Sequence, residues 1–416
     1  MSKQSFIERL LDGVTVEWKA LGSLGEFIRG NGLQKSDFTD SGVGCIHYGQ
    51  IYTFYGDYAY QTKSFVSPTL ANRLRKAQKG DLIIATTSEN IEDVCKTLVW
   101  LGEKEVCVSG ETYIFKHSQN PKYLAHYLKT PHFFDFKKRN QTGTKVIRVH
   151  GDKLATFQVP IPCPDDPEKS LKIQTEIVRI LDTFTELTAE LTAELTARKK
   201  QYTYYRDQLL TFGESGVVWK PLGVVCDYVD YRGKTPKKTT YGVFLVTAKN
   251  IRMGYIDYKA SQEFISVSDY DLVMRRGLPE IGDVLITTEA PCGFVAQVDR
   301  KDIALAQRVI KYRSKNKSLL NSFIKHYLKG CQFQTKLLNA ATGSTVKGIK
   351  GSKLHKLTIP IPPLEEQERI VSILDKFDTL TYSITEGLPR EIELRKQQYE
   401  YYRDMLFTFP KDSVEA

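Results

Sequence analysis

Three short stretches of the sequence resemble catalytic motifs, and each lacks part of its motif. Asn120-Pro121-Lys122-Tyr123 resembles the NPPY motif of amino-methyltransferases, but the second proline is missing and no glycine-rich cofactor loop precedes it. Gly233-Lys234-Thr235 resembles the end of a phosphate-binding loop, although Tyr228 stands where that loop requires glycine. Pro164-Asp165 has no ExK or DxK at nuclease spacing downstream. The sequence therefore predicts that the chain performs no bond chemistry.

The histidines and cysteines form no pattern typical of a metal site or an activated nucleophile. The seven histidines are scattered, and His126 and His326 fall on predicted helices, where structural roles are more common than catalytic ones. The seven cysteines include no close pair such as CxxC, which predicts reduced, mostly buried thiols rather than a zinc site or a disulfide framework. We expect this chain to bind no metal and no cofactor.

Short loops in both halves instead combine glycine, small hydroxyl and basic residues. Backbone N–H groups of a glycine turn, hydroxyls and fixed cations bind phosphates, whereas base edges require side chains that reach into a groove. Residues 86–90 and 287–289, which follow predicted strands, are the candidates for base contacts. The glycines could merely make turns, but the loops recur in both halves. The predicted DNA-contacting residues are Arg29, Lys35, Thr86, Thr87, Ser88, Thr144, Lys145, Arg148, Arg232, Lys234, Thr235, Lys237, Thr287, Thr288, Ser344, Thr345, Lys347 and Lys350.

The net charge of +10 is unevenly distributed along the 416 residues. Residues 168–212 have a net charge of zero and residues 363–412 of −4, so the remaining segments carry +14. A nucleic-acid surface has this electrostatic character, although a solvated basic face has it too. The sequence has no run of 18 apolar residues and no hydrophobic signal core at its start, which predicts a soluble cytoplasmic protein without a membrane segment.

Two long helical stretches must position the loops. Asp166 and Pro167 predict the start of the first, and a helix over residues 168–212 would reach about 60 Å, the length of a spacer. Two TAEL tetrads shift its seam before Tyr202. The apolar residues at coiled-coil spacing are Ile173, Ile177, Ile180, Phe184, Leu187 and Leu191.

Residues 365–409 repeat the ends of the first helical stretch. IVRILDTF returns as IVSILDKF and RKKQYTYYRD as RKQQYEYYRD, but Gly387 and Pro389 predict a break in the second helix. The preceding segments repeat as well, from VEWKALG and VVWKPLG to VPIP and IPIP. The chain is therefore a tandem duplication with an α/β (α+β) fold, in which DLIIATT and DVLITTE are buried strands.

These repeats predict five segments and a cyclic arrangement. The segments are an N-terminal helical segment, residues 1–15; a first globular domain, 16–164; a central helical region, 165–213; a second globular domain, 214–362; and a C-terminal helical region, 363–412. A short amphipathic helix in residues 5–12 precedes the first domain as the long helix precedes the second. If the C-terminal helix packs beside it, the molecule closes with pseudo-twofold symmetry.

Together these features resemble the DNA-specificity subunits of type I restriction-modification systems, and by the TAEL tetrads most closely subclass IC. The resemblance rests on TAELTAEL, on the RKKQYTYYRDQLLTF and RKQQYEYYRDMLFTF segments, on the IPIP segments and on the TGST loop at Thr342, and it covers essentially the full length. It implies two target-recognition domains that each read one half of a bipartite DNA sequence. It also implies that two helical regions, forming an antiparallel coiled coil, hold these domains apart.

The resemblance further implies double-stranded DNA as ligand and two kinds of protein partner. Two modification subunits would carry S-adenosylmethionine and methylate adenine, and restriction subunits would use ATP to translocate and cleave DNA. The YYRD segments are either partner-binding or part of the helical seam. Their residues are Tyr204, Tyr205, Arg206, Tyr401, Tyr402 and Arg403.

Three other functions stay open at this point. A self-contained adenine methyltransferase would bind S-adenosylmethionine as the purified chain. A coiled-coil adaptor would show no salt-dependent DNA affinity and would leave the charge of +14 unexplained. A stand-alone DNA-binding protein would act without partner subunits.

Overall fold

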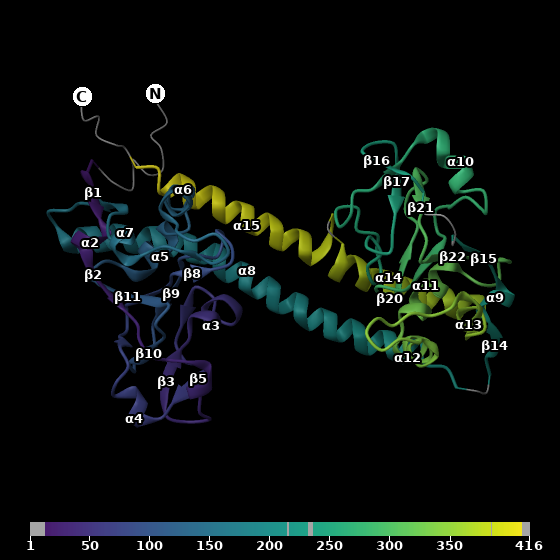
Figure 1. Ribbon diagram of the computed structural model, residues 1–416, viewed down its shortest axis with the longest axis horizontal. Helices are drawn as coiled ribbons and strands as arrows, with labels where there is room; N and C mark the ends of the chain where they lie inside the picture. Colours follow the sequence, from purple (N-terminus) through teal and green to yellow (C-terminus); the bar gives the residue numbers. More distant parts are fainter. Residues whose placement is uncertain (1–12, 214–215, 232–235, 384, 410–416) are drawn as a thin grey trace. The chain divides into compact units, whose positions relative to one another are not determined.

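Two similar units make up the chain (Figure 1). The computed structural model describes residues 13–213, 216–231, 236–383 and 385–409. The first unit comprises Met1–Ala189 and Leu394–Ala416, and the second comprises Glu190–Glu393. Each unit therefore combines one globular domain with parts of the long helices. The predicted helix of residues 5–12 lies outside the described residues.

The first domain is built on two mixed sheets. The larger has the strand order β2-β11-β7-β9-β4, and the smaller has the order β5-β3-β10-β6. All four residues of β7 are buried, as its β-branched sequence predicts. The strands are β1 (Val16–Ala20), β2 (Gly25–Arg29), β3 (Val43–Ile46), β4 (Tyr58–Ala59), β5 (Ser64–Val66), β6 (Lys76–Ala77), β7 (Leu82–Ala85), β8 (Thr87–Ser88), β9 (Lys96–Trp100), β10 (Val106–Val108), β11 (Thr112–His117), β12 (Ile147–Arg148) and β13 (Gln158–Pro162).

Short helices cover these sheets. Asn120 caps α5, because its side chain accepts hydrogen bonds from the backbone N–H groups of Lys122 and Tyr123. The helices of the first domain are α2 (Leu21–Leu24), η1 (Lys35–Asp37), α3 (Tyr48–Thr53), α4 (Pro68–Ala71), α5 (Pro121–Tyr127), α6 (Pro131–Asn140) and α7 (Gly151–Leu154).

The second domain repeats this framework. Its sheets have the orders β15-β22-β19-β20 and β16-β18-β17-β21, and the parallel pair of β17 and β21 corresponds to that of β3 and β10. The strands are β14 (Val218–Pro221), β15 (Cys226–Asp230), β16 (Lys238–Thr239), β17 (Val243–Val246), β18 (Phe264–Ile265), β19 (Val284–Thr288), β20 (Cys292–Gln297), β21 (Ile303–Leu305), β22 (Val309–Ser314) and β23 (Thr358–Ile361). The helices are α9 (Leu222–Val225), η2 (Val267–Asp269), α10 (Tyr270–Val273), α11 (Asn321–Lys329), α12 (Cys331–Ala340) and α13 (Gly351–Leu354).

The repeated sequence landmarks pair with one another inside each unit. In the first unit, Trp18 of β1 lies opposite Pro160 of the VPIP segment. In the second unit, Trp219 of β14 lies opposite Pro360 of the IPIP segment. These two-stranded sheets join the start of each domain to its end, immediately before a long helix.

The long helices begin and break where the sequence predicts. α8 (Pro167–Leu209) begins with the carboxylate of Asp166 accepting a hydrogen bond from Lys169 N at 3.0 Å. The second helical region consists of α14 (Leu364–Tyr382) and α15 (Gly387–Leu406), and Gly387 has φ of +75° with no room for a Cβ. In the second unit, Tyr205 stacks on Phe377 while Lys199 lies over Tyr382, so α8 and α14 run antiparallel.

The predicted seam of α8 is buried near the first domain and only partly buried toward the tetrads, where Leu191 and Leu195 are half-buried. Ile173 and Ile177 are buried, and polar Gln174 and Asp182 are buried beside them. Leu187, by contrast, is 37% exposed. The seam therefore mixes apolar and polar contacts with the domain rather than continuing as a purely apolar coiled-coil stripe.

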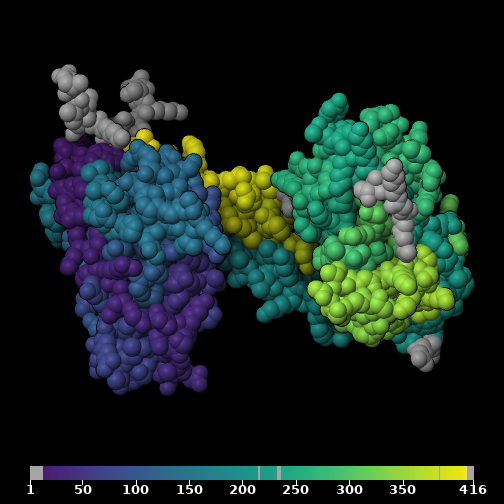
Figure 2. Space-filling view, viewed as in Figure 1, coloured from purple at the N-terminus to yellow at the C-terminus, as the bar shows by residue number. Residues whose placement is uncertain are grey.

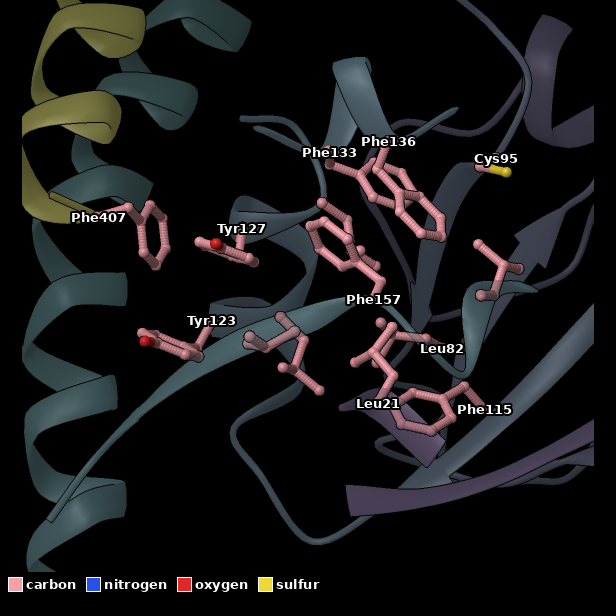
Figure 3. Packing of buried hydrophobic residues seen from close by; sticks show 14 of the residues in the cluster. Leu21, Leu82, Cys95, Phe115, Tyr123, Tyr127, Phe133, Phe136, Phe157 and Phe407 are labelled. Carbon is pink, nitrogen blue, oxygen red and sulfur yellow. The ribbon is translucent and has the colours of Figure 1, made fainter. Parts of the chain in front are cut away.

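The C-terminal end of α15 packs into the core of the first domain. Phe407, immediately after α15, lies 5.1 Å from Tyr127 and 5.2 Å from Tyr123 between ring centroids (Figure 3). Leu406 is fully buried in the same cluster. In the space-filling view the yellow C-terminal residues contact the blue surface of the first domain (Figure 2). The chain thus returns to the domain where it began, as a cyclic arrangement requires.

Two further sequence expectations concern thiols and membranes. All seven cysteines are free, and Cys45, Cys95, Cys107 and Cys226 are buried. Across the described ranges, no helix combines the length and apolar character needed to cross a bilayer.

Candidate nucleic-acid interface

Several of the predicted DNA-contacting residues of the first unit lie at one end of the larger sheet, where β7 ends and β11 begins. We call this end of the strands the recognition edge. The backbone N–H of Thr86, after β7, donates to the carbonyl of Glu111, before β11, at 3.1 Å. The carbonyl of Thr86 accepts from Val149 N, also at 3.1 Å, and Arg148 of β12 pairs with Thr87 of β8. The backbone therefore fixes three chain segments side by side at this edge.

The side chains of Arg29, Thr87 and Arg148 converge on Glu111. Arg148 Nη2 lies 2.9 Å and the Thr87 hydroxyl 2.7 Å from Oε2 of Glu111, while Arg29 Nη2 lies 3.7 Å from Oε1. Burial raises the pKa of Glu111, but the Thr87 hydrogen bond and the two guanidinium charges outweigh it, so the pKa is below its ordinary value. The cluster is an ionised carboxylate between two cations on a half-exposed surface.

The second unit builds the same edge with other side chains. The N–H of Thr288 donates to the carbonyl of Arg308 at 2.9 Å, and the carbonyl of Thr288 accepts from Ile349 N at 2.9 Å. Glu289 bridges to Gly348 through the backbone, and its Oε2 lies 3.3 Å from Nε of Arg308. The backbone frame is shared, whereas the charged groups on it differ.

The glycine loops next to these edges have a strict backbone requirement. Gly143 and Gly343 have φ of +88° and +112°, and a Cβ on either would lie 2.1 Å from a backbone carbonyl oxygen. Each loop closes with a pair of backbone hydrogen bonds, Thr142 with Arg148 and Thr342 with Gly348. The residues that the closed loops present to solvent are Thr144, Lys145, Ser344, Thr345 and Lys347.

The remaining predicted contact residues are scattered. Lys237 and Lys350 are exposed, whereas Lys35 on η1 is close enough to His47 for its charge to add to the burial that lowers the pKa of that imidazole. Ser88 and Thr288 are half-buried. Arg232, Lys234 and Thr235 lie outside the described residues.

Two of the threonines predicted to contact DNA are buried beneath the surface of the recognition edge. Thr86 is 3% exposed and its hydroxyl donates to the carbonyl of Glu111. Thr287 is fully buried, and its hydroxyl accepts from Phe294 N at 2.9 Å and donates to the carbonyl of Pro291. Their hydroxyls hold the strand ends together, and both residues are buried in this structure.

Sequence reasoning missed Glu111 and Arg308, whereas Glu289 lies in the predicted base-contacting segment of residues 287–289. Glu111 is a lone carboxylate rather than a basic or hydroxyl residue, and Arg308 has no glycine beside it, so neither fits the pattern of the predicted contact residues. The available signal was position, because Glu111 immediately precedes β11 and Arg308 immediately precedes β22, the corresponding strand.

The stretch that resembles the NPPY motif is part of the protein scaffold. Asn120 caps α5 and donates through Nδ2 to the hydroxyl of Thr175 at 3.2 Å. Tyr123 is fully buried and its hydroxyl donates to the carbonyl of Pro160 at 2.7 Å. Both side chains are thus used in hydrogen bonds that hold α5 to its neighbours.

A hydrogen-bonded cluster ties the first domain to both long helices. His126 of α5 lies with Nε2 3.1 Å from Oδ1 of Asp182 in α8 and with Nδ1 2.9 Å from the hydroxyl of Tyr399 in α15. Lys122 and Tyr58 also donate to Asp182. Burial raises the pKa of Asp182, but its three hydrogen-bond donors outweigh burial and lower the pKa to about 2. Because Asp182 is an acceptor, Nε2 carries the imidazole proton and Nδ1 accepts from Tyr399.

A related cluster connects the second domain to α8 and α14. Nε2 of His326 lies 2.8 Å from Asp375 of α14, and burial lowers the pKa of His326 to about 4. Lys329 bonds Asp378 of α14 at 2.8 Å and the hydroxyl of Tyr202 of α8 at 3.0 Å. His326, Asp375 and Asp378 have ligand atoms within 4.8 Å of one another. Lysine ammonium groups already neutralise both carboxylates, so the geometry is that of an ion-pair network.

Comparison with known proteins gives one consistent result. The sequence matches the family described as Type I restriction modification DNA specificity domain twice, over residues 14–198 and 216–394. The chain belongs to this family. It is 37% identical to the EcoR124I/EcoR124II specificity subunit of Escherichia coli, over 99% of this chain and 98% of that protein. It is 31% identical to a putative type I restriction enzyme specificity subunit of Haemophilus influenzae, over 98% and 99% of the two chains.

Solved structures of type I restriction-modification proteins share the fold. The S subunit from M. genitalium matches with a TM-score of 0.54 and 12% identity, over 96% of this chain and 98% of that one. A chain from a structure addressing complex assembly and conformational transition of the type I R-M system matches with a TM-score of 0.59 and 18% identity, over 94% and 97%.

In this family member the tyrosines predicted to bind partners fall into two groups. Tyr204 and Tyr401 are 61% and 66% exposed. Tyr205 and Tyr402 are less exposed and stack on Phe377 and Phe184, respectively, in the helix seam. Arg206 and Arg403 point inward and bond the neighbouring carboxylates of Asp207 and Asp404. Tyr204 and Tyr401 thus fit a partner-binding role, whereas Tyr205 and Tyr402 fit a role in the helical seam.

Proposed function

We propose that this chain is the DNA sequence-specificity subunit of a type I restriction-modification complex and reads a bipartite, asymmetric target. Residues 16–164 would read one half-site and residues 214–362 the other. The observation that carries the proposal is the pair of polar sheet edges. They have the same backbone hydrogen bonds but different charged side chains, as expected for two readers of different sequences.

The chain itself would recognise DNA and leave the chemistry to partners. Two modification subunits would methylate adenine, and restriction subunits would use ATP to move along and cleave DNA. The exposed Tyr204 and Tyr401 occupy corresponding positions on α8 and α15 and offer two similar docking positions. Aromatic side chains of this exposure are common anchors of protein interfaces. Two docking positions in one chain fit two copies of one partner.

Co-expression tests the proposal. The chain would be produced with a type I modification subunit of the same subclass in cells that lack other adenine methylation, and methylated adenines would be mapped by sequencing the genome. The proposal predicts a split motif with modified adenines in both halves and an unread spacer.

The alternatives give different results in the same experiment. If no stable complex forms, while the purified chain binds DNA in a salt-dependent manner, the chain is a stand-alone DNA-binding protein. Methylation by the purified chain without a modification subunit would show it to be a methyltransferase. A chain that forms a complex but has no affinity for DNA would be an adaptor.

A further inference from the structure

The two recognition edges can be matched position by position. In each unit the strand that follows the matched residue, β11 after Glu111 or β22 after Arg308, pairs with its two neighbours in the same register. The matching pairs are Thr112 with Ala85 and Tyr113 with Arg29 in the first unit, and Val309 with Thr287 and Ile310 with Asp230 in the second. Because one residue of slip would reverse every side chain in a strand, this register makes the assignment unique.

The matched positions carry different, largely opposite, chemistry. Glu111 of the first unit corresponds to Arg308 of the second, since the carbonyl of each accepts from the matching threonine N–H. The four pairs are Arg29 and Asp230, Thr87 and Glu289, Glu111 and Arg308, and Arg148 and Gly348. The two units thus share the backbone hydrogen bonds at these positions, but the side chains carry different charges, which are opposite in two of the four pairs.

We propose that Glu111 and Arg308 are specificity-determining residues, one for each half-site; this inference rests on the proposed function. The chemistry of each side chain selects a base. A carboxylate accepts from an exocyclic amino group, so Glu111 would contact the amino group of cytosine or adenine. A guanidinium donates two parallel hydrogen bonds, so Arg308 would contact O6 and N7 of guanine.

Both side chains retain hydrogen-bonding capacity in this structure. Oε1 of Glu111 is 3.7 Å from Arg29, beyond hydrogen-bond distance, while Oε2 holds the two short contacts. Arg308 faces Glu289 at Nε, at 3.3 Å, and one carboxylate cannot engage all five guanidinium donors. The side chains are 32% and 52% exposed, so a ligand can reach them.

Stability alone does not account for these arrangements. Ion pairs at this exposure contribute little to folding, because water screens them and ordering the side chains has an entropic cost. The neighbours instead favour one orientation of each group: Arg148, Thr87 and Arg29 surround Glu111, and Glu289 faces Arg308. Such pre-orientation reduces the ordering cost on binding and is what direct readout of a base edge requires.

The test uses the complex of the full chain with a modification subunit. Methylation rates would be measured on the genomic motif and on duplexes carrying each single base-pair change. Glu111→Gln is expected to reduce discrimination about ten- to a hundredfold at one position of the first half-site only. Arg308→Lys is expected to do the same at one position of the second half-site only, because lysine cannot form the paired hydrogen bonds.

Matched controls come from exposed ion pairs elsewhere in the same units. Glu103→Gln removes a charge paired with Lys79 in the first unit, and Arg300→Lys replaces a guanidinium paired with Asp302 in the second. Both controls should leave the motif unchanged. Glu111→Asp, which keeps the charge but shortens the side chain, supplies the same readout if Glu111→Gln fails to assemble.

The outcomes separate this inference from the proposed function. If the wild-type complex methylated no split motif, the proposed function itself would be wrong. A wild-type split motif that both variants retain with unchanged discrimination would overturn the role of Glu111 and Arg308 alone. A uniform loss of methylation across all bases would also overturn it, because it would indicate phosphate contacts instead of base readout.

Discussion

The clusters around His126 and His326 show what the duplication has kept and what it has changed. Each domain holds one histidine against an aspartate of one long helix, Asp182 or Asp375. Tyr399 completes the first cluster by bonding His126, whereas its counterpart Tyr202 bonds Lys329. The difference follows from Asp378, which occupies the position of Thr185 and draws the lysine into the network.

Each domain is therefore hydrogen-bonded to both long helices, but the two domains use different hydrogen bonds to do so. The first cluster has one ion pair, between Lys122 and Asp182, and a tyrosine hydrogen bond to its histidine. The second cluster has two lysines, Lys325 and Lys329, paired with Asp375 and Asp378. The recognition edges differ further, because there the charge itself is inverted between Glu111 and Arg308. The hydrogen bonds that hold the helices thus differ between the units while the geometry is kept. At the recognition edges the difference in charge is what we expect if each edge reads a different DNA sequence.

The largest expected effect on stability comes from breaking a buried ion pair in the second cluster. Asp378→Asn leaves the ammonium of Lys329, whose side chain is 1% exposed, without its carboxylate. The free energy of unfolding should fall by about 3–5 kcal/mol, the cost of an uncompensated buried charge. Asp57→Asn is the matched change in the first unit, because Asp57 pairs with the corresponding Lys129 at a half-exposed site. It should cost at most about 1 kcal/mol.

Denaturation by urea measures both changes, with the wild-type chain in parallel. Equal losses for the two variants would mean that the units do not differ in the way their clusters are stabilised.

A smaller effect concerns pH. Burial lowers the pKa of His326 from 6.5 to about 4, so between these values the unfolded chain binds a proton that the folded protein does not. The free energy of unfolding therefore falls as the pH drops below 6.5, and the contribution of His326 lost by pH 5 is about 2 kcal/mol. The pKa of Asp182, at about 2, lies below this window.

His326→Gln isolates that contribution, since glutamine can donate to Asp375 but does not titrate. The stability difference between wild type and variant should shrink by about 2 kcal/mol from pH 7 to pH 5. A difference that stays constant over this range would show that His326 is not held neutral by burial.

Removal of a single hydroxyl distinguishes the roles of the two tyrosines. Tyr399→Phe leaves Nδ1 of buried His126 without its donor, which should cost about 1–3 kcal/mol. Tyr202→Phe should cost about 1 kcal/mol or less, because Lys329 keeps both oxygens of Asp378. Urea unfolding of the two variants gives the comparison, and the reverse order would contradict the assigned hydrogen bonds.

The smallest expected change in stability belongs to the exposed tyrosines. Tyr204→Ala and Tyr401→Ala should each change the free energy of unfolding by less than about 0.5 kcal/mol, since both side chains project into solvent. Each should nevertheless weaken binding of one modification subunit, measured by the stoichiometry of the purified complex. Unchanged stoichiometry and affinity in the double variant would exclude these residues from the partner interface.

The sequence predicted the features that depend on local chemistry. The Asp166 cap, the break at Gly387 and the buried strand at residues 82–85 follow from capping, backbone freedom and β-branched side chains. The repeats also indicated which segments correspond, and the structure pairs the opening and closing strands of each domain accordingly.

Features that depend on tertiary contacts could not be predicted. Apolar spacing in α8 marks a face, but only the domain packed on it explains why Asp182 is buried while Leu187 is exposed. Thr86 follows β7, whereas Thr287 lies within β19, and both are buried with their hydroxyls bonded to backbone carbonyls. Glu111 becomes recognisable only when the register places it between Arg29 and Arg148.

We infer that the two domains read the DNA sequence while the long helices set the spacing between the two half-sites. One added TAEL tetrad after Leu195 lengthens α8 by about 6 Å and turns it by about 40°, while one base pair advances about 3.4 Å and turns about 35°. Mapping methylated adenines for this insertion variant tests the claim most directly. The account predicts unchanged half-sites and an unread spacer longer by one base pair. Altered half-site bases with an unchanged spacer would contradict it.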